Sequence, residues 1–201
     1  WRKVMLPLAE AGYYVIAPDQ RGYGRTTGWD PGYDGDLGSF GMLNLARDAL
    51  GLVAAFGRRT VAAVVGHDFG SPVAAWCALI RPDVFRSVVM MSAPFAGPPA
   101  LPFDTLASEG RAGADTAGAS RPPDIHAELA ALARPRKHYT WYYSQREANE
   151  NMWRCPQGVH DFLRAYYHHK SADWPGNRPF PLDAWNAAEL AKMPTYYIMD
   201  L

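Results

Sequence analysis

The sequence has few cysteines, no excess of either charge and no long apolar run. Its 201 residues include two cysteines, and 20 basic and 20 acidic side chains give a formal net charge of zero. Neither cysteine lies in a Cys-x-x-Cys pair, so the spacing indicates neither a zinc site nor a disulfide framework. The balanced charge gives no electrostatic reason to expect nucleic acid or an anionic membrane as a partner. No stretch reaches the ~18 apolar residues of a membrane span.

The two ends of the chain indicate a fragment. It begins at Trp1 and stops at Leu201, directly after the apolar run Tyr-Tyr-Ile-Met-Asp. We therefore expect segments to be missing on both sides, so the lack of a leader segment carries no information. Cys77 lies on an apolar helical face, where we expect a small buried side chain. With no disulfide framework indicated, we expect the protein to be in a reducing, cytoplasmic compartment.

Residues 60–80 hold the most informative pattern of the chain. An apolar, β-branched run is followed by Gly66-His67-Asp68-Phe69-Gly70 and then by an apolar helical stretch. This pattern predicts a strand, a sharp elbow and a helix, with Asp68 at the apex. We expect a glycine on each side because the elbow brings backbone segments too close for a Cβ atom and leaves its apex exposed and strained. The spacing is that of the G-x-S-x-G nucleophile elbow, with aspartate in place of serine.

Two interpretations of Asp68 follow. Aspartate before a helix is often an ordinary N-cap, but an N-cap does not require glycine two residues before and two residues after it. As a nucleophile, a carboxylate that attacks a saturated carbon forms an ester that water can later hydrolyse, whereas a serine would form an inert ether. The nucleophile interpretation predicts alkyl transfer to Asp68 followed by hydrolysis.

The order of elements around the elbow predicts an α/β fold, with a mostly parallel sheet covered by helices on both faces. Apolar spacing and the glycine and proline positions assign the elements to a helix at 1–11, a strand at 13–17, a helix at 40–56, the elbow strand, a helix at 72–80 and a strand at 85–91. Ligands of such sheets bind at the carboxyl ends of the strands, where Asp68 lies. We assign residues 1–97 to this partial core.

Beyond residue 97 the composition changes. The segment up to residue 123 is rich in glycine, alanine and proline, which predicts a long connection without a strand or a stable helix. Helical spacing then recurs in 124–133, 137–152, 158–170 and 181–191. We therefore assign 98–201 to a linker and an incomplete, all-helical cap inserted after a sheet strand. Within it, His168, His169 and Lys170 are expected to form a solvated helix end.

Three segments carry a family resemblance: L-A-E-A-G-Y-Y-V-I-A-P-D-Q-R-G-Y-G-R-T at 8–26, G-H-D-F-G at 66–70 and R-P-D-V-F-R-S-V-V-M-M-S-A-P-F at 81–95. In these the chain resembles the epoxide hydrolases of the α/β-hydrolase superfamily, in the branch with an aspartate nucleophile. The resemblance implies an α/β-hydrolase fold with a cap, an epoxide and water as substrates, a vicinal diol as product, and neither cofactor nor metal.

The resemblance also implies roles for individual residues. The backbone N–H of Phe69 would form one half of the oxyanion hole. The run from Tyr139 to Tyr143 is similar to the family's Y-x-x-Y-[F/Y] motif, which makes Tyr139 the expected proton donor to the epoxide oxygen. Tyr142 and Tyr143 lie on the same helical face and are alternative donors or substrate-binding residues. The structural alternative is that these aromatic side chains only pack in the cap.

Other parts of the implied machinery are not found in the sequence. None of the six histidines has the context of the family's water-activating base. We expect this histidine, its orienting acid and a second cap tyrosine beyond Leu201, and the H-G-x-P oxyanion loop before Trp1, so that this chain alone would not turn over. Haloalkane dehalogenases share the aspartate but usually carry tryptophan at position 69, and fluoroacetate dehalogenases usually carry arginine there. A non-catalytic binding protein on the same fold is the third interpretation.

Overall fold

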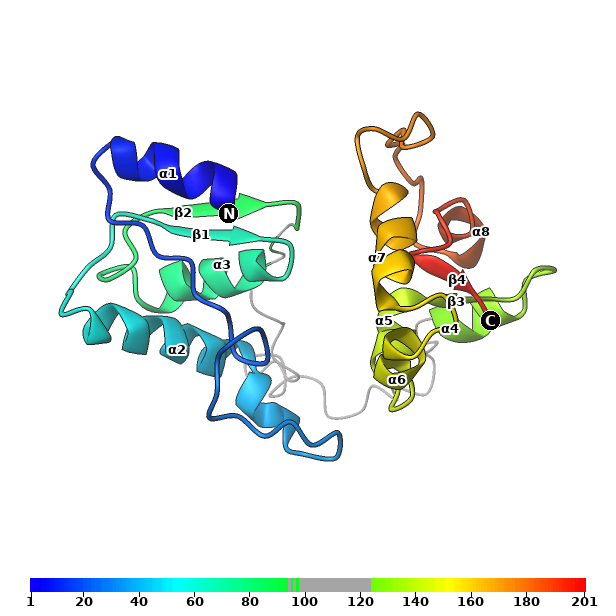
Figure 1. Ribbon diagram of the computed structural model, residues 1–201, viewed down its shortest axis with the longest axis horizontal. Helices are drawn as coiled ribbons and strands as arrows, with labels where there is room; N and C mark the ends of the chain where they lie inside the picture. The colour runs from blue at the N-terminus through cyan, green and yellow to red at the C-terminus, as the bar shows by residue number, and fades with distance from the viewer. Residues whose placement is uncertain (94, 96, 98–123) are drawn as a thin grey trace, which may run out of the picture. The chain divides into compact units, whose positions relative to one another are not determined.

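The computed structural model describes residues 1–93, 95, 97 and 124–201 (Figure 1). The chain divides into two compact units, Trp1–Asp104 and Thr105–Leu201. The described elements of the first unit are α1 (Arg2–Glu10), the 3-10 helix η1 (Leu37–Phe40), α2 (Met42–Ala55), β1 (Val64–His67), α3 (Gly70–Ile80) and β2 (Val88–Met91). The predicted boundary at 97 and 98 stays a prediction, and the predicted linker at 98–123 lies outside the described residues.

Two parallel strands form the sheet in the described part of the first unit. β1 pairs with β2 in a register that runs from Val64↔Val88 to His67↔Met91, and an isolated parallel bridge joins Val61 to Phe85. α3 is the crossover that parallel pairing requires. The predicted order of strand, elbow, helix and strand is therefore confirmed, with α3 beginning at Gly70 rather than at residue 72.

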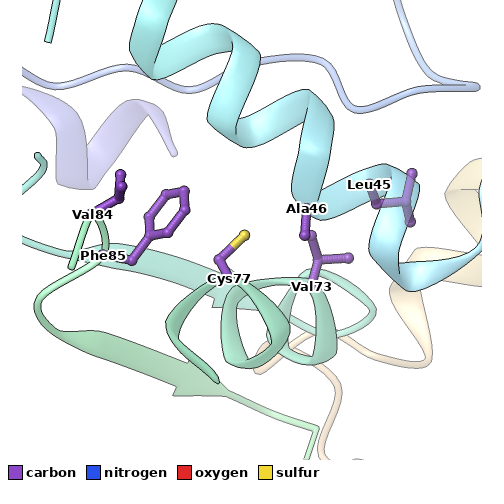
Figure 2. Close-up of a cluster of buried hydrophobic side chains, with 6 residues drawn as sticks. All are labelled: Leu45, Ala46, Val73, Cys77, Val84 and Phe85. Atoms are coloured by element: carbon purple, nitrogen blue, oxygen red, sulfur yellow. The ribbon is translucent and has the colours of Figure 1, made fainter. Parts of the chain in front are cut away.

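The core of the first unit lies where α2 and α3 pack together on one face of this sheet. Figure 2 shows its six buried residues: Leu45, Ala46, Val73, Cys77, Val84 and Phe85. Cys77 is fully buried, which confirms the prediction for this cysteine. Burying a large apolar side chain such as Phe85 contributes about 2–3 kcal/mol, so this cluster fixes α3, and with it the elbow, against the sheet.

The other face of the sheet is open in the described residues. Gly66 faces α3, whereas Val65 is 40% exposed and Val89 on β2 is 45% exposed. In the described part of the first unit, α3 covers one face of these two strands. A continuous apolar run indicates a strand that is suited to burial, but it does not specify which element buries it.

Residues 13–17 form no strand, contrary to the prediction. α1 ends as predicted: Gly12 has φ 91°, and the N–H of Tyr13 donates to the carbonyl of Leu8. A strand also needs ladder hydrogen bonds to a neighbour, and residues 14–17 donate none to the described backbone. Local apolar character alone does not make this segment a strand.

The second unit contains both helices and strands. Its described elements are α4 (Ile125–Ala130), β3 (Arg136–His138), α5 (Tyr139–Tyr143), α6 (Ala148–Trp153), α7 (Val159–His168), α8 (Ala187–Leu190) and β4 (Ile198–Asp200). β3 and β4 are antiparallel, with Arg136 opposite Asp200, and the buried core consists of Leu129, Ala187, Leu190 and Ile198. The prediction that only helices occur here is therefore wrong. Across the described ranges, no helix has both the length and the apolar character needed to cross a bilayer.

A long-range ion pair explains why the predicted helix at 137–152 is divided. The carboxylate of Asp200 accepts hydrogen bonds from Arg134 at 2.7 Å and from Arg136 at 2.8 Å, across 64 residues of sequence in the second case. Both bonds lower the pKa of Asp200. β3 is thus held to β4, and His138 ends it by capping α5 through the N–H of Thr140. These non-local contacts override the local preference for helix.

We expect Cys77 to resist thiol reagents in the folded protein. Burial raises the pKa of its thiol to about 11, so little of the reactive thiolate is present near pH ~8. Cys155 is partly exposed and should react at least ~10-fold faster with Ellman's reagent. The rates are compared in Cys77→Ser and Cys155→Ser variants of the full-length protein. Equal rates in native buffer would contradict the prediction, and equal rates in urea are expected.

Candidate active site

The turn between β1 and α3 presents Asp68 at the carboxyl end of β1 (Figure 1). Asp68 has φ 53°, in the left-handed region that costs a non-glycine residue of order 1–3 kcal/mol. The residue is exposed. The predicted geometry of the apex, exposed and strained, is therefore confirmed.

The backbone of Asp68 is held at both of its polar groups. Its N–H donates to the carbonyl of Met91 at 3.0 Å, and its carbonyl accepts from the N–H of Ser71 at 2.9 Å. Within the described ranges, no hydrogen bond or ion pair occupies its carboxylate. The N-cap of α3 is Phe69, and no side chain caps this helix. The N-cap interpretation of Asp68 is therefore wrong, and the carboxylate is free to react.

The two glycines of the elbow have different roles. A Cβ atom on Gly66 would overlap the carbonyl group of Gly70 and lie 2.7 Å from the Cα of Ser71. β1 and α3 can therefore approach each other only because residue 66 has no side chain. A Cβ atom on Gly70 would meet no described atom within 4 Å. The close-approach prediction is confirmed for Gly66 and wrong for Gly70.

Ser71 is a fully buried polar residue of the elbow that nothing in the sequence singled out. Its Oγ accepts a hydrogen bond from the N–H of Met91 at 3.0 Å. The same oxygen lies 2.8 Å from the carbonyl of Met91 and 3.0 Å from that of Gly66. A hydroxyl has one proton, so it donates to one of these carbonyls at a time. Ser71 thereby joins α3 to the ends of both strands.

Phe69 and Ser92 lie next to this strand end. The N–H of Phe69 has no hydrogen-bond partner among the described residues, which leaves it available to an anionic oxygen. Ser92 follows Met91, the register partner of His67, and has φ 66°. Asp68 and Ser92 are the non-glycine residues with positive φ in the described chain. Both strained residues therefore directly follow the paired ends of β1 and β2, a feature that the sequence does not signal.

Among the described residues, Asp68 belongs neither to the hollow found in the first unit nor to a metal site. A hollow of about 450 Å³ in the first unit does not include this residue and is lined by Gly38, Gly41, Met42, Leu43, Asn44 and Trp76. His67, the histidine next to Asp68, is exposed. In the part of the chain that the structure describes, no three histidine, cysteine or carboxylate side chains are placed to hold a metal ion.

Tyr139, Tyr142 and Tyr143 all lie on α5 of the second unit. The ring of Tyr139 packs edge-on against Tyr143, with 5.6 Å between ring centres, and against Tyr197, at 5.2 Å. Its N–H donates to the carbonyl of Tyr197 at 2.8 Å. Tyr139 and Tyr143 thus meet on one side of α5, as their spacing predicts.

Tyr143 and Tyr142 differ in what their hydroxyl groups bind. Burial raises the pKa of Tyr143, and a hydrogen bond to Tyr166 on α7 raises it further. The hydroxyl oxygen of Tyr142 accepts from Asn151 at 3.3 Å, and the ammonium of Lys137 lies 4.5 Å from its ring centre. A phenol has one proton. The hydroxyl of Tyr143 is therefore in a hydrogen bond with Tyr166, whereas the contacts with Asn151 and Lys137 do not use the proton of Tyr142.

The expectation of a solvated helix end after α7 is wrong for Lys170. Its ammonium donates to the hydroxyl of Tyr166 at 2.9 Å. It also lies 5.0 Å from the ring centre of Tyr196 and 4.9 Å from that of Tyr197. His168 and His169 are exposed, as expected. The sequence signal for this contact is the four-residue spacing of Tyr166 and Lys170, because residues four apart lie side by side on a helix.

We expect Gly66→Ala to disrupt the elbow and Gly70→Ala, the matched control, to be tolerated. The new methyl group at position 66 would overlap backbone atoms, and we expect a loss of ~3 kcal/mol or more in the free energy of unfolding. The change at position 70 should stay within ~1 kcal/mol, because alanine favours a helix. Urea unfolding of both variants measures this. Similar losses at both positions would contradict the assigned roles.

Comparison with known proteins finds relatives that are named as epoxide hydrolases. Among curated proteins, "Epoxide hydrolase B" of Mycobacterium tuberculosis (strain ATCC 25618 / H37Rv) is 37% identical over 147 residues, which are 71% of this chain and 34% of that protein. "Epoxide hydrolase" of Caballeronia sordidicola is 41% identical over 95 residues, 47% of this chain and 27% of that protein. The chain thus spans about a third or less of these relatives.

A solved structure and a family match extend over more of the chain. The structure described as "Epoxide hydrolase from an endophytic Streptomyces" superposes with a TM-score of 0.53 at 27% identity, over 88% of this chain and 45% of that one. Residues 1–198 match the family described as "alpha/beta hydrolase fold". The predicted fold class is therefore confirmed, and the chain belongs to the alpha/beta hydrolase fold family.

Proposed function

We propose that the protein is a hydrolase that opens epoxides to vicinal diols through a covalent ester on Asp68. The observation that carries this proposal is an unoccupied, exposed carboxylate on a residue whose strained backbone is fixed at both polar groups. The relatives' names as epoxide hydrolases support the substrate class. The proposed substrates are an epoxide and water.

In the first step an oxygen of the Asp68 carboxylate attacks one ring carbon of the epoxide. A carbon–oxygen bond to the carboxylate forms as the ring carbon–oxygen bond breaks, and the electron pair stays on the departing oxygen. That oxygen takes a proton from a phenol of the cap. The carboxylate needs no separate base, because Asp68 attacks as an anion.

In the second step water attacks the carbonyl carbon of the Asp68 ester. A base takes one proton from this water, the role in which the family resemblance implies a histidine. Negative charge develops on the carbonyl oxygen, and the free N–H of Phe69 is suited to stabilise it. Collapse of this intermediate breaks the ester carbon–oxygen bond, and the departing oxygen takes the proton held by the base to give the diol. The second proton of the attacking water returns to the phenolate, which restores the phenol and the Asp68 carboxylate and closes the cycle.

Tyr139 is the proposed proton donor of the cap. Tyr143 shares its face of α5, but its hydroxyl is already in a hydrogen bond with Tyr166. Tyr142 is proposed to contact the substrate, since its hydroxyl proton is not engaged by Asn151 or Lys137. The choice of Tyr139 follows the resemblance of residues 139–143 to the family's cap motif.

Phe69 argues against a halide as the leaving group. Its side chain has no N–H with which to stabilise a departing halide, and it is 60% exposed. An epoxide leaves no separate ion to bind, because the departing oxygen stays attached to the substrate and is protonated instead. Epoxide opening therefore fits residue 69 better than dehalogenation does.

We expect Asp68→Asn to abolish turnover while the protein stays folded. Without the anionic nucleophile, diol formation by the full-length protein should fall ~10³-fold or more. Asp83→Asn is the matched control: Asp83 is exposed and pairs with Arg81 just after α3, and its loss should change the rate less than ~2-fold. Product formation from a terminal aryl epoxide is measured by chromatography.

Intact-mass spectrometry provides the direct test of the ester. Wild-type protein mixed with a slowly hydrolysed epoxide should gain the mass of that epoxide, with the adduct on the peptide that contains Asp68. An unchanged mass, together with diol formation by Asp68→Asn, would contradict covalent catalysis. Binding of the epoxide without any turnover would instead favour the non-catalytic interpretation.

We expect Tyr139→Phe to slow the reaction more than Tyr143→Phe. Removing the proposed donor should lower kcat ~10²-fold with little change in KM, whereas removing the Tyr143 hydroxyl, which is already hydrogen-bonded to Tyr166, should cost less than ~5-fold. Initial rates with the same epoxide are compared after circular dichroism has shown that both variants fold. A larger loss for Tyr143→Phe would reverse the assignment.

A further inference from the structure

The second unit contains a hollow whose described lining includes none of the residues proposed for catalysis. Its volume is about 330 Å³, at the small end of the range for pockets that bind small molecules. It lies between the loop that follows α7 and the segment before β4 (Figure 1), and it is lined in part by Trp174, Arg178, Phe180, Lys192 and Pro194. Among the described residues that line it there is no aspartate or glutamate. The hollow therefore combines aromatic side chains with basic ones.

Arg178 supplies the unbalanced charge of this hollow. Its Nε donates to the carbonyl of Pro175 at 3.3 Å, and within the described ranges no carboxylate forms an ion pair with its guanidinium. Lys192 differs, because its ammonium is paired with the carboxylate of Glu189. A guanidinium stays charged and offers a fork of N–H groups that fits the two oxygens of a carboxylate. An anion that enters the hollow can therefore bind Arg178 without displacing a carboxylate partner.

Trp174 is held in place as a wall of the hollow. The ring of His169 packs against it, with 4.8 Å between ring centres, and the Nδ1 of His169 lies 3.0 Å from the carbonyl of Ala165. Gly176 is so close to the indole that a Cβ atom there would lie 2.5 Å from its Cζ2. The indole nevertheless stays partly exposed. A flat ligand can pack on an aromatic side chain that is already ordered at a low cost in conformational entropy.

The side chain of Asn177 holds the loop that carries Trp174 and Arg178. Its Nδ2 donates to the carbonyls of Lys170 and Ser171, each at 3.2 Å. Its backbone N–H donates to the carbonyl of Trp174 at 3.0 Å. These bonds join the loop to the end of α7, so that the guanidinium and the indole are placed before a ligand arrives. Such preorganisation lowers the cost of binding.

We propose that this hollow is a binding site for a small aromatic carboxylate, with the carboxylate on Arg178 and the ring against Trp174 and Phe180. The side chain of Phe180 is 50% exposed, so a bound ring would remove apolar surface from water. An inorganic anion would leave the aromatic walls in water, and a neutral aromatic compound would leave the guanidinium without a partner. A molecule that carries both groups therefore fits best. This proposal does not depend on the proposed function.

The binding test uses the full-length protein and three probes: 2-naphthoate, the neutral 2-naphthalenemethanol, and acetate. The tryptophans carry fluorine at ring position 5 and are observed by ¹⁹F NMR, and Trp174→Phe assigns the Trp174 signal. 2-Naphthoate should shift this signal with a Kd of ~0.1–1 mM, and the other two probes should bind at least ~10-fold more weakly. Equal Kd values for 2-naphthoate and the alcohol would overturn the proposal. A shift confined to other tryptophans, or no shift at ~10 mM ligand, would also overturn it.

Two variants test the charge and the aromatic wall separately. Arg178→Gln should weaken 2-naphthoate binding ~10-fold or more. Arg164→Gln is the matched control, because it removes the same charge from an exposed residue of α7 outside the hollow, and it should change the Kd less than ~2-fold. Equal losses in the two variants would indicate general electrostatic attraction and overturn the site.

Gly176→Ala tests the indole without changing any charge. The new methyl group would displace Trp174, so the Kd should rise ~5-fold while circular dichroism shows an intact fold. An unchanged Kd would overturn the assigned role of the indole. None of these measurements contains an epoxide, so they decide the proposal whether or not the protein forms a diol.

Discussion

The close approach of β1 to α3 at Gly66 is the contact on which the candidate active site depends. Because residue 66 has no Cβ, the first turn of α3 reaches the strand ends and Ser71 can bind both of them. Asp68 spans this gap in a left-handed conformation, with φ 53°. Hydrogen bonds of ~1 kcal/mol each at its N–H and carbonyl, with those of Ser71, are sufficient to offset a strain of order 1–3 kcal/mol.

This arrangement separates the backbone of Asp68 from its side chain. The backbone groups are all used to hold the turn, whereas the carboxylate is left without a described partner. A nucleophile benefits from both properties, because a fixed backbone limits the directions of attack and an unpaired carboxylate loses no hydrogen bond when it reacts. An N-cap aspartate has the opposite arrangement, with its carboxylate bound to the helix, and α3 has no such bond.

The sequence predicts those features that depend on neighbours along the chain. The order of β1, α3 and β2, the burial of Cys77 and the strained apex at Asp68 follow from apolar runs and glycine positions that are close in sequence. The features that it does not predict depend on distant partners. Arg136 forms a strand because Asp200 lies opposite to it, and Ser71 is buried because Met91 comes to its hydroxyl. The exposed face of β1 is likewise a property of what packs there and not of Val65 itself.

The tyrosines of α5 show why a motif alone does not assign roles. The run from Tyr139 to Tyr143 offers three phenols of the same chemistry and similar exposure, and spacing places two of them on one face. What distinguishes them is the partner of each ring and hydroxyl: Tyr139 packs against Tyr197, Tyr142 accepts from Asn151, and Tyr143 is hydrogen-bonded to Tyr166. The surroundings of the three phenols are therefore set by residues outside the motif, which the motif itself does not reveal.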